Sequence, residues 1–446
     1  MPKATGCEGC DSGGGDYERD DVFEARAGLH ELIGNDAASF NETCLEWAVV
    51  RKLLILASLV VFVDTMFFAA IVPLLPGLSD EFDLTKTTAG ILSGSYAAGT
   101  LIAAIPAGFM AARVGARRTT LFGLGLMTVT VLVFAFAQST ELLTASRFLQ
   151  GAAGACSWAG ALSWLIAASP RERRGELLGS AMAAAIAGVL LGPAVGALAD
   201  VLSREAVFSA VGFAGLGLAA MTLRIPPPPG RGEASFASLR VALGSAPVRF
   251  GFLLILVPGM VFGAIDVLVP LELDAFGAGA ITIAAVFLAC AGFEAIVAPL
   301  AGRVSDRRGR FGPCAAGLAV AAVTMVLIQL PERAWVLGAV VIVAAPGIGM
   351  LWSPAMAMLS DGAEAAGVNL GLAFGLTNLG WGVGHAVGGA VAPAVADAGG
   401  DGLAYTGLAV LSLLALAALF ARRDAVEATL ALPARNLGSG AVAESG

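Results

Sequence analysis

Charged residues are scarce in this sequence: Asp, Glu, Lys and Arg make up only 13% of its 446 positions, whereas apolar residues make up 57%. Together with a mean hydropathy of +0.83, this balance excludes an ordinary soluble domain and predicts a protein that crosses a membrane many times. The sequence has no basic patch, and its net charge of -8 comes from acids in the N-terminal region and in short loops. We therefore set aside a nucleic-acid partner.

Histidine and clustered cysteine are also rare. The chain has two histidines, and no nucleophile stands beside a base in the sequence, which argues against an enzyme. The six cysteines are scattered and imply no disulfide framework. Cys7 and Cys10 form a CxxC pair, but no second pair follows, so a zinc site is disfavoured. We expect no cofactor and no metal.

What is present is a series of apolar runs, each long enough to cross a bilayer at about 20 residues. The sequence predicts an all-α integral membrane protein with twelve transmembrane helices. Hydropathy places them near 53–75, 88–111, 119–137, 142–168, 177–199, 206–223, 250–271, 281–301, 313–330, 334–359, 367–396 and 402–421.

Two long polar segments divide the rest of the chain. Residues 1–50 are acidic and lack the order of a signal peptide, so we expect a disordered cytoplasmic tail. The proline-rich stretch 224–249 separates a six-helix bundle at 51–223 from another at 250–421, and residues 422–446 form a C-terminal tail. Two such halves are typical of transporters that enclose a site at the midplane.

Lysine and arginine in the loops predict the orientation, because positive charge stays on the cytoplasmic side. Most loop arginines fall on one side, and the other side has only Lys86, Arg204 and Arg333. Both termini are therefore expected in the cytoplasm. The composition and short loops indicate a bacterial inner membrane, with an intracellular vesicle membrane as the alternative.

One acid stands out in the first span, VVFVDTMFFAAIVPLLP, where Asp64 interrupts an otherwise apolar run. A charge at the centre of a membrane helix costs about 2.5–3.5 kcal/mol on insertion scales, so such an acid normally faces protein or a water-filled cavity. We expect Asp64 to face a substrate path. The alternative is an acid neutralised by protonation or by a buried partner.

Two loops share a pattern of glycine and arginine. GFMAARVGARR follows the second span and GRVSDRRGR follows the eighth, and both resemble the signature loop of the major facilitator superfamily. The resemblance implies a fold of two pseudo-symmetric six-helix bundles, with a latch in which arginines bind helix carbonyls and acids. The first loop departs from the pattern at Ala112, where the superfamily has Asp. The residues expected in the latch are Gly108, Arg113, Gly115, Arg117, Gly302, Asp306, Arg307 and Gly309.

Two further motifs narrow the resemblance to drug:proton antiporters. RFLQGAAG in the fourth span places Arg147 where the superfamily has an arginine associated with proton transfer, although the residue could instead clamp backbone carbonyls. GVLLGPAVGA in the fifth span looks like the antiporter motif, and its Gly192 and Pro193 would shape a bend. Small-residue packing alone could also explain the glycine spacing.

Within the superfamily, the chain is most similar to the vesicular amine transporter group. Asp64-Thr-Met with Pro73, and Asp266-Val-Leu-Val-Pro, match that group's first and seventh helices. The resemblance implies that Asp64 and Asp266 face each other across a cavity, and it aligns Tyr96 and Asn378 with that group's site residues. That group has an acid in its tenth helix, and the aligned position in this chain is Gly349.

Glu294 and His385 are additional titratable groups within the spans, and they could join a proton relay or simply make helix contacts. The expected function is proton-coupled export of a small organic, cationic compound, with the proton gradient as driving force and a monomer as the working unit. Asp64, Asp266, Tyr96 and Asn378 would bind substrate. The rivals are symport of a neutral metabolite or sugar, and a membrane enzyme or sensor.

Overall fold

The computed structural model describes residues 49–170, 173–227, 240, 244–365 and 370–423. The tail with its CxxC, most of the proline-rich connection and the C-terminal tail lie outside these residues. Contacts divide the chain into a unit at Met1–Arg51 and a large unit at Lys52–Gly446. All regular structure in the described residues is helical.

The described residues contain 11 helices long and apolar enough to cross a membrane, plus the shorter apolar helix Phe311–Leu327, which confirms the expected all-helical class. The first span is Val49–Phe82, and its last part is α2 (Ile71–Phe82). The other helical elements are α3 (Lys86–Arg113), α4 (Ala116–Ala135), α5 (Thr140–Ala168), α6 (Arg174–Val201), α7 (Arg204–Arg224), α9 (Ala246–Ala275), α10 (Ala280–Arg308), α11 (Phe311–Leu327), α12 (Ala334–Gly349), α13 (Trp352–Ala365), α14 (Leu370–Gly399) and α15 (Asp401–Ala421). Of these, α12 and α13 together make up the single span Ala334–Ala363.

Prolines explain where two spans are interrupted. The first span turns at Ala70, because Pro73 has no N–H to donate to the carbonyl three or four residues earlier. The tenth predicted span, 334–359, is divided into α12 and α13 at Met350 and Leu351, because Pro354 has no N–H to donate to the Met350 carbonyl. A hydropathy profile shows each of these two spans as one apolar run, because a proline interrupts the helix without making the sequence polar.

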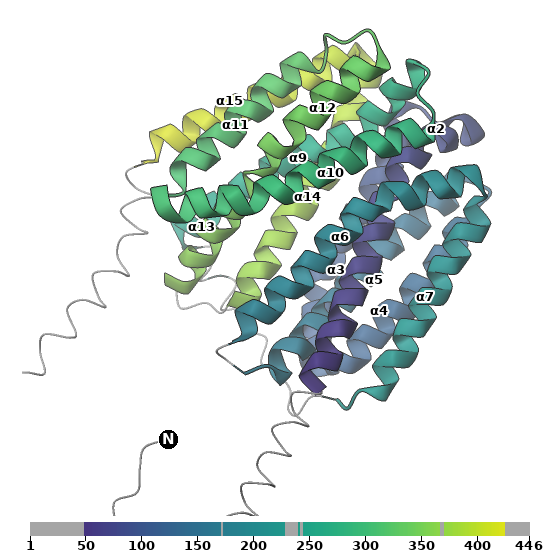
Figure 1. Ribbon diagram of the computed structural model, residues 1–446, viewed down its shortest axis with the longest axis vertical. Helices are drawn as coiled ribbons and strands as arrows, with labels where there is room; N and C mark the ends of the chain where they lie inside the picture. Colours follow the sequence, from purple (N-terminus) through teal and green to yellow (C-terminus); the bar gives the residue numbers. More distant parts are fainter. Residues whose placement is uncertain (1–48, 171–172, 228–239, 241–243, 366–369, 424–446) are drawn as a thin grey trace, which may run out of the picture. The chain divides into compact units, whose positions relative to one another are not determined.

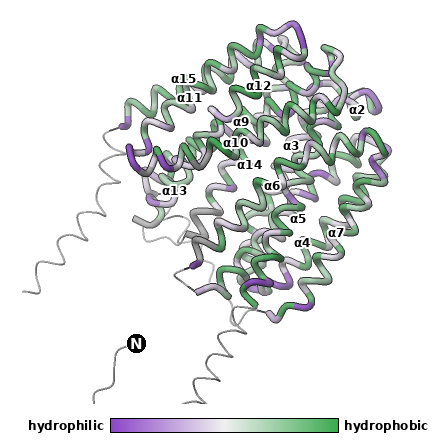
Figure 2. The backbone as a smooth tube through the Cα atoms, viewed as in Figure 1, coloured by the Kyte–Doolittle hydropathy of each residue, from purple (hydrophilic) through white to green (hydrophobic). Residues whose placement is uncertain are grey.

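The helices form two groups, the first span with α3 to α7 and, after the connection, α9 to α15 (Figure 1). In the first, α5 packs against α3 and α4, and α4 packs against α7. In the second, α9 packs against α13 and α14, α10 against α12, and α11 against α15. Polar residues gather at the helix ends and apolar residues fill the middles, as a membrane requires (Figure 2).

The two groups meet along α3 and α14, and along α6 and α10. Glycines allow the close approach of α3 to α14: a Cβ on Gly90 would lie 2.8 Å from the Pro393 side chain, and one on Gly94 would lie 3.2 Å from the Ala386 carbonyl. The half of α3 after Thr100 is mostly not buried. The contact therefore belongs to the half of α3 that begins at Lys86.

Polar contacts between the groups lie at the same end. Lys86 Nζ lies 2.5 Å from Asp401 Oδ1, and the Thr87 backbone N–H donates to Asp397 Oδ2 over 2.7 Å. At the arginine-rich end, two polar contacts join helices of the same group. There Arg117 donates to the Leu223 carbonyl, and Arg310 pairs with Asp361.

Candidate functional site

Asp64 is buried in the first group, with only 7% of its surface exposed. The Tyr96 hydroxyl on α3 donates to Asp64 Oδ1 over 2.6 Å, and the Trp158 indole N–H on α5 donates to Oδ2 over 2.8 Å. A buried carboxylate is costly unless its oxygens accept hydrogen bonds. These two donors therefore lower the free-energy cost of burying Asp64 within a membrane span.

Glycines of α5 create the room for this carboxylate. A Cβ on Gly154 would lie 2.6 Å from Asp64 Oδ1 and 2.9 Å from the Tyr96 hydroxyl oxygen, which real side chains do not permit. One turn earlier, Gly151 lies directly against the backbone of Tyr96. The glycines of the RFLQGAAG motif thus let α5 approach both α3 and the first span.

Arg147 on α5 is 1% exposed and acts electrostatically on this carboxylate. Its guanidinium donates to the carbonyl oxygens of Phe67 and Phe68 over 3.3 and 3.2 Å, and it lies 4.9 Å from the centre of the Tyr96 ring. This geometry is that of a clamp on backbone carbonyls. The same position makes Arg147 an electrostatic neighbour of Asp64, so the first group carries its own counter-charge.

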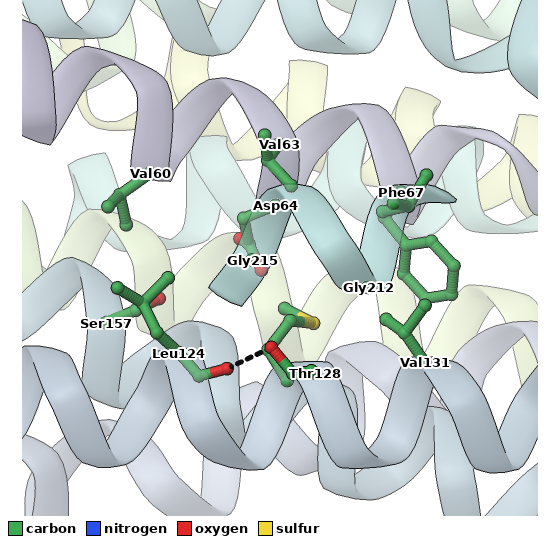
Figure 3. Close-up of a pocket in the computed structure, with 12 residues that line it drawn as sticks. Val60, Val63, Asp64, Phe67, Leu124, Thr128, Val131, Ser157, Gly212 and Gly215 are labelled. Atoms are coloured by element: carbon green, nitrogen blue, oxygen red, sulfur yellow. Dashed lines mark hydrogen bonds between the residues drawn. The ribbon is translucent and has the colours of Figure 1, made fainter. Parts of the chain in front are cut away.

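A pocket opens beside Asp64 within the first group (Figure 3). The first span, α4, α5 and α7 line it, mostly with apolar side chains such as Val60, Phe67 and Val131. The Thr128 hydroxyl at its edge donates to the Leu124 carbonyl over 2.9 Å. Asp64 is the charged residue among the lining residues.

Aromatic side chains connect this site to the second group. Phe68 contacts Tyr96, Trp381 and His385, with ring centres 5.1, 5.2 and 5.1 Å apart. Trp381 stacks on His385 at an interplanar angle of 22°. Both lie on α14, so Phe68 forms a bridge between the groups at the level of the buried acids.

His385 lies beside Asp266 of α9, with its Nε2 3.7 Å from Asp266 Oδ2. Glu294 of α10 is an electrostatic neighbour of Asp266. The Glu294 carboxylate occupies the space that Gly349 of α12 leaves open, since a Cβ there would lie 2.6 Å from its carboxyl carbon. The structure thus brings Asp266 and His385 together in the second group, with Glu294 on the neighbouring helix α10, and Asp64 and Tyr96 together in the first.

The antiporter-type motif packs its glycines against the first span. A Cβ on Gly192 would lie 2.7 Å from the Met66 carbonyl, and one on Gly196 would lie 2.7 Å from the Pro73 side chain. The Thr65 hydroxyl also donates to the Ala185 carbonyl of α6 over 2.8 Å. Pro193 lies buried inside α6. The motif therefore holds the helix that carries Asp64.

The loop motifs make tight turns at glycines. Gly115 and Gly309 have φ of 103° and 86°, in the left-handed region that favours glycine. Arg117 donates to the Leu223 carbonyl near the end of α7 over 2.6 Å. The remaining latch candidates are placed as follows: Gly108 has open space around it, Arg113 lies over the Phe109 ring, Gly302 faces Ser353, Arg307 is exposed, and the Asp306 side chain lies outside the described part of the chain.

Two features of the site go beyond the sequence interpretation or stay outside its test. Asn378 lies two turns before His385 on α14 with an exposed side chain, and its role in substrate binding stays a prediction. Trp158 and Trp381 contact the site and were not among the sequence candidates. One signal was available for Trp158: its indole N–H needs an acceptor inside an apolar helix.

Comparison with known proteins identifies the fold and its relatives. Residues 57–373 match the sequence model of the Major Facilitator Superfamily. A solved bacterial homolog of the human lysosomal transporter Spinster, in an inward-facing and unoccupied conformation, superimposes with a TM-score of 0.66. That match covers 87% of this chain and 97% of the other at 15% sequence identity, so it shows the fold alone.

Curated relatives match over shorter stretches. Multidrug resistance protein 1 of Bacillus subtilis (strain 168) is 30% identical over 168 residues, which are 37% of this chain and 43% of that protein. A probable sugar efflux transporter of Helicobacter pylori (strain G27) is 26% identical over 216 residues, or 48% of this chain and 54% of that protein. The chain thus spans about half the length of these relatives.

Proposed function

Because this chain belongs to the Major Facilitator Superfamily, we propose that it is a multi-pass membrane transporter that exports a small organic cation in exchange for protons. It works by alternating access, in which one helix group rocks against the other around a midplane site. The cell membrane is the proposed location, with both termini in the cytoplasm, and the proposed working unit is a monomer.

The buried carboxylate of Asp64 carries this proposal. It lies within a membrane span beside two aromatic donors, Tyr96 and Trp158, at 2.6 and 2.8 Å. A carboxylate with aromatic rings around it attracts a protonated amine through charge and through the ring faces. Arg147, clamped to the adjacent carbonyls, adjusts the charge balance at this carboxylate.

The proposed division of roles follows the sequence interpretation. Asp64 and Asp266 bind substrate or proton, Glu294 and His385 take part in the proton step, and Gly192 and Pro193 shape the helix that supports Asp64. The efflux relatives support export as the direction, since both carry efflux or resistance in their names. The amine class rests on the resemblance of the first and seventh helices.

A second candidate function is transport of a neutral sugar or metabolite. The match to a probable sugar efflux transporter favours it. It predicts no need for a charged carboxylate in substrate binding, because uncharged hydrogen-bonding groups can hold a neutral solute. A flux panel that includes neutral sugars and lipophilic cations, with and without an imposed pH gradient, separates the two.

The decisive variant is Asp64→Asn in proteoliposomes. It removes the charge and keeps the shape, so we expect pH-gradient-driven exchange of ethidium or tetraphenylphosphonium to fall to the level of empty liposomes while the protein stays monodisperse. The matched control is Asp83→Asn, the same substitution at an exposed position after α2, where φ is 50° and Asn is well tolerated. Unchanged cation exchange by Asp64→Asn would defeat the proposal.

A further inference from the structure

Helix α3 starts, at the end of the molecule predicted to face outward, with backbone donors that need partners. The N–H groups in the first turn of any α-helix find no carbonyl within the helix. The Ala89 N–H makes the first internal bond of α3, to the Thr85 carbonyl over 2.9 Å. The Thr85 hydroxyl is the N-cap and accepts the Thr88 N–H over 3.2 Å. The Thr87 N–H between them needs an acceptor from outside α3.

That acceptor is Asp397 of α14, in the other helix group. Its Oδ2 accepts the Thr87 backbone N–H over 2.7 Å, and the Thr87 hydroxyl donates to the same oxygen. A carboxylate at the start of a helix satisfies the free donors there and interacts favourably with the positive end of the helix dipole. Asp397 therefore acts as an additional N-cap of α3 that the second group supplies, which we call the trans cap.

The position of Asp397 within its own helix supports the same role. α14 ends at Gly399, so Asp397 stands in its last turn, where the negative end of the helix dipole disfavours an acid. Asp397 is thus unfavourable for α14 and favourable for α3, whose first turn it reaches. A residue that breaks a local preference and makes a contact between two parts of a protein is expected at functional positions.

Close helix packing continues from the trans cap along α3 and α14. A Cβ on Gly90 would lie 2.8 Å from the Pro393 side chain, and one on Gly94 would lie 3.2 Å from the Ala386 carbonyl. These pairs follow one another along the two antiparallel helices, and the trans cap lies at the end of the row. The two groups therefore cannot separate at this end of α3 and α14 without breaking it.

A salt bridge lies next to the trans cap but holds the helices in a different way. Lys86, the residue before Thr87, has its Nζ 2.5 Å from Asp401 Oδ1, and both side chains are partly exposed. Such a pair contributes little, because ordering long side chains costs entropy and water screens the charges. The trans cap instead binds a backbone N–H, whose position is fixed by the helix itself. Asp397 therefore fixes the start of α3 more directly than the salt bridge does.

We propose that the trans cap is a conformational device: Asp397 of the second group binds the first turn of α3 and thereby keeps the two helix groups closed at the end predicted to face outward. When this end opens, the Thr87 donors and the Asp397 carboxylate exchange their mutual bonds for bonds to water. The trans cap thus sets how much of the protein is open on this side, without contact with a substrate. Its importance for export rests on the proposed function, because an exporter opens this end to release its substrate.

Distances between two spin labels, measured by double electron–electron resonance on the full chain without substrate, test the trans cap. One label replaces Glu141 at the start of α5 and the other replaces Glu332 between α11 and α12; both positions are exposed, one in each group, at the predicted outward end. Asp397→Ala should raise the ratio of long to short distances about fivefold, which is the usual effect of losing an N-cap. Asp397→Asn keeps an accepting oxygen and should raise the ratio less. An unchanged ratio in Asp397→Ala would overturn the proposal.

Thr87→Val separates a bond to Asp397 from a general loss of packing. It removes the donating hydroxyl but keeps the branched shape and the backbone N–H, so the ratio should rise about twofold when Asp397 is present. The same substitution should have no effect in Asp397→Ala, because the bond is already lost there. Equal effects in both backgrounds would overturn the trans cap. Glu205→Ala, which removes an exposed acid from the first turn of α7, is the matched control and should keep the wild-type ratio.

These distances decide the trans cap independently of transport. If the wild type moves no cation in proteoliposomes, the proposed function fails while the distances still decide the trans cap. If the distances do not respond to Asp397→Ala, the trans cap fails while ethidium exchange by the wild type still supports the proposed function. If Asp397→Ala is not monodisperse, Asp397→Asn takes its place in both comparisons, and an unchanged ratio in that variant overturns the proposal.

Discussion

At the scale of single residues, the cost of burying Asp64 explains its surroundings. Hydrogen bonds to a charged group contribute about 1.5–3 kcal/mol each, and Asp64 accepts two from protein donors. A cationic substrate must therefore share or replace well-formed bonds rather than fill an unsatisfied site. Weak binding in the resting state and ready release are the expected consequences.

Gly154→Ala tests the packing that permits this arrangement. The added Cβ would lie 2.6 Å from Asp64 Oδ1, so the carboxylate must move away from Tyr96. We expect at least a tenfold loss of cation affinity, measured by tetraphenylphosphonium binding to the purified protein. Gly125→Ala on α4, whose Cβ would meet nothing within 4 Å, is the matched control. Equal affinity in the two variants would contradict the account.

How much of the site could be read from the sequence depends on the kind of signal each residue leaves. Asp64 is a charge in an apolar run, and that contrast identified it, whereas Arg147 and Asp266 were identified by their resemblance to family motifs. Trp158 left no comparable contrast, because an aromatic ring in a membrane helix is ordinary. Asn378 was selected by alignment to a family position; the structure gives it an exposed side chain, and its role stays a prediction.

At the scale of elements, α6 shows why glycines recur every four residues. Gly188, Gly192 and Gly196 each lie against the backbone of the first span, where any side chain would collide. From this spacing the sequence predicted a helix face without side chains, which lets another helix approach closely. The spacing does not tell which helix packs there, because that depends on long-range packing.

Gly192→Ala should therefore destabilise the protein. Its Cβ would collide with Ala69 and the Met66 carbonyl, and such overpacking costs about 1–3 kcal/mol. A lower midpoint of thermal unfolding in detergent is the expected result. Gly179→Ala on the same helix, where a Cβ would meet nothing within 4 Å, should unfold at the wild-type temperature. Equal midpoints would show that α6 does not need the glycine for packing.

Span boundaries show the limit of hydropathy. The hydropathy profile located the spans, because about 20 consecutive apolar residues give a clear maximum in it. It ended the first span near residue 75, whereas the structure continues it to Phe82. Polar residues can extend a helix beyond the apolar run, and their hydrogen bonds to the chain are invisible to a hydropathy average.

At the scale of the whole molecule, polar contacts and close helix packing join the two helix groups at the end that contains Lys86. Lys86 with Asp401, and Thr87 with Asp397, join the groups where α3 and α14 also pack closely. We interpret this set of contacts as a closed gate on the side predicted to face outward. The superfamily and the twelve-span fold are confirmed; membership in the vesicular amine group stays a prediction.

Disrupting this gate should favour the opposite conformation. Because Lys86 and Asp401 are partly exposed, their pair contributes no more than about 1 kcal/mol, or about fivefold in population. In a protein carrying Ala97→Cys at the buried α3–α14 contact, Asp401→Asn should raise labelling by a membrane-impermeant maleimide about that much. The charge swap Lys86→Asp with Asp401→Lys should restore the parent rate. An unaltered rate in Asp401→Asn would show that the pair does not act as a gate.

The central claim is that organic cations and protons move in opposite directions through this chain. The most direct measurement is the internal pH of wild-type proteoliposomes, read from a trapped pyranine dye, when an outward ethidium gradient is imposed with no initial pH gradient. Coupling is reciprocal, so ethidium leaving the vesicle should draw protons in and acidify the lumen. Alkalinisation would indicate symport, and ethidium efflux with no change in internal pH would contradict proton coupling altogether.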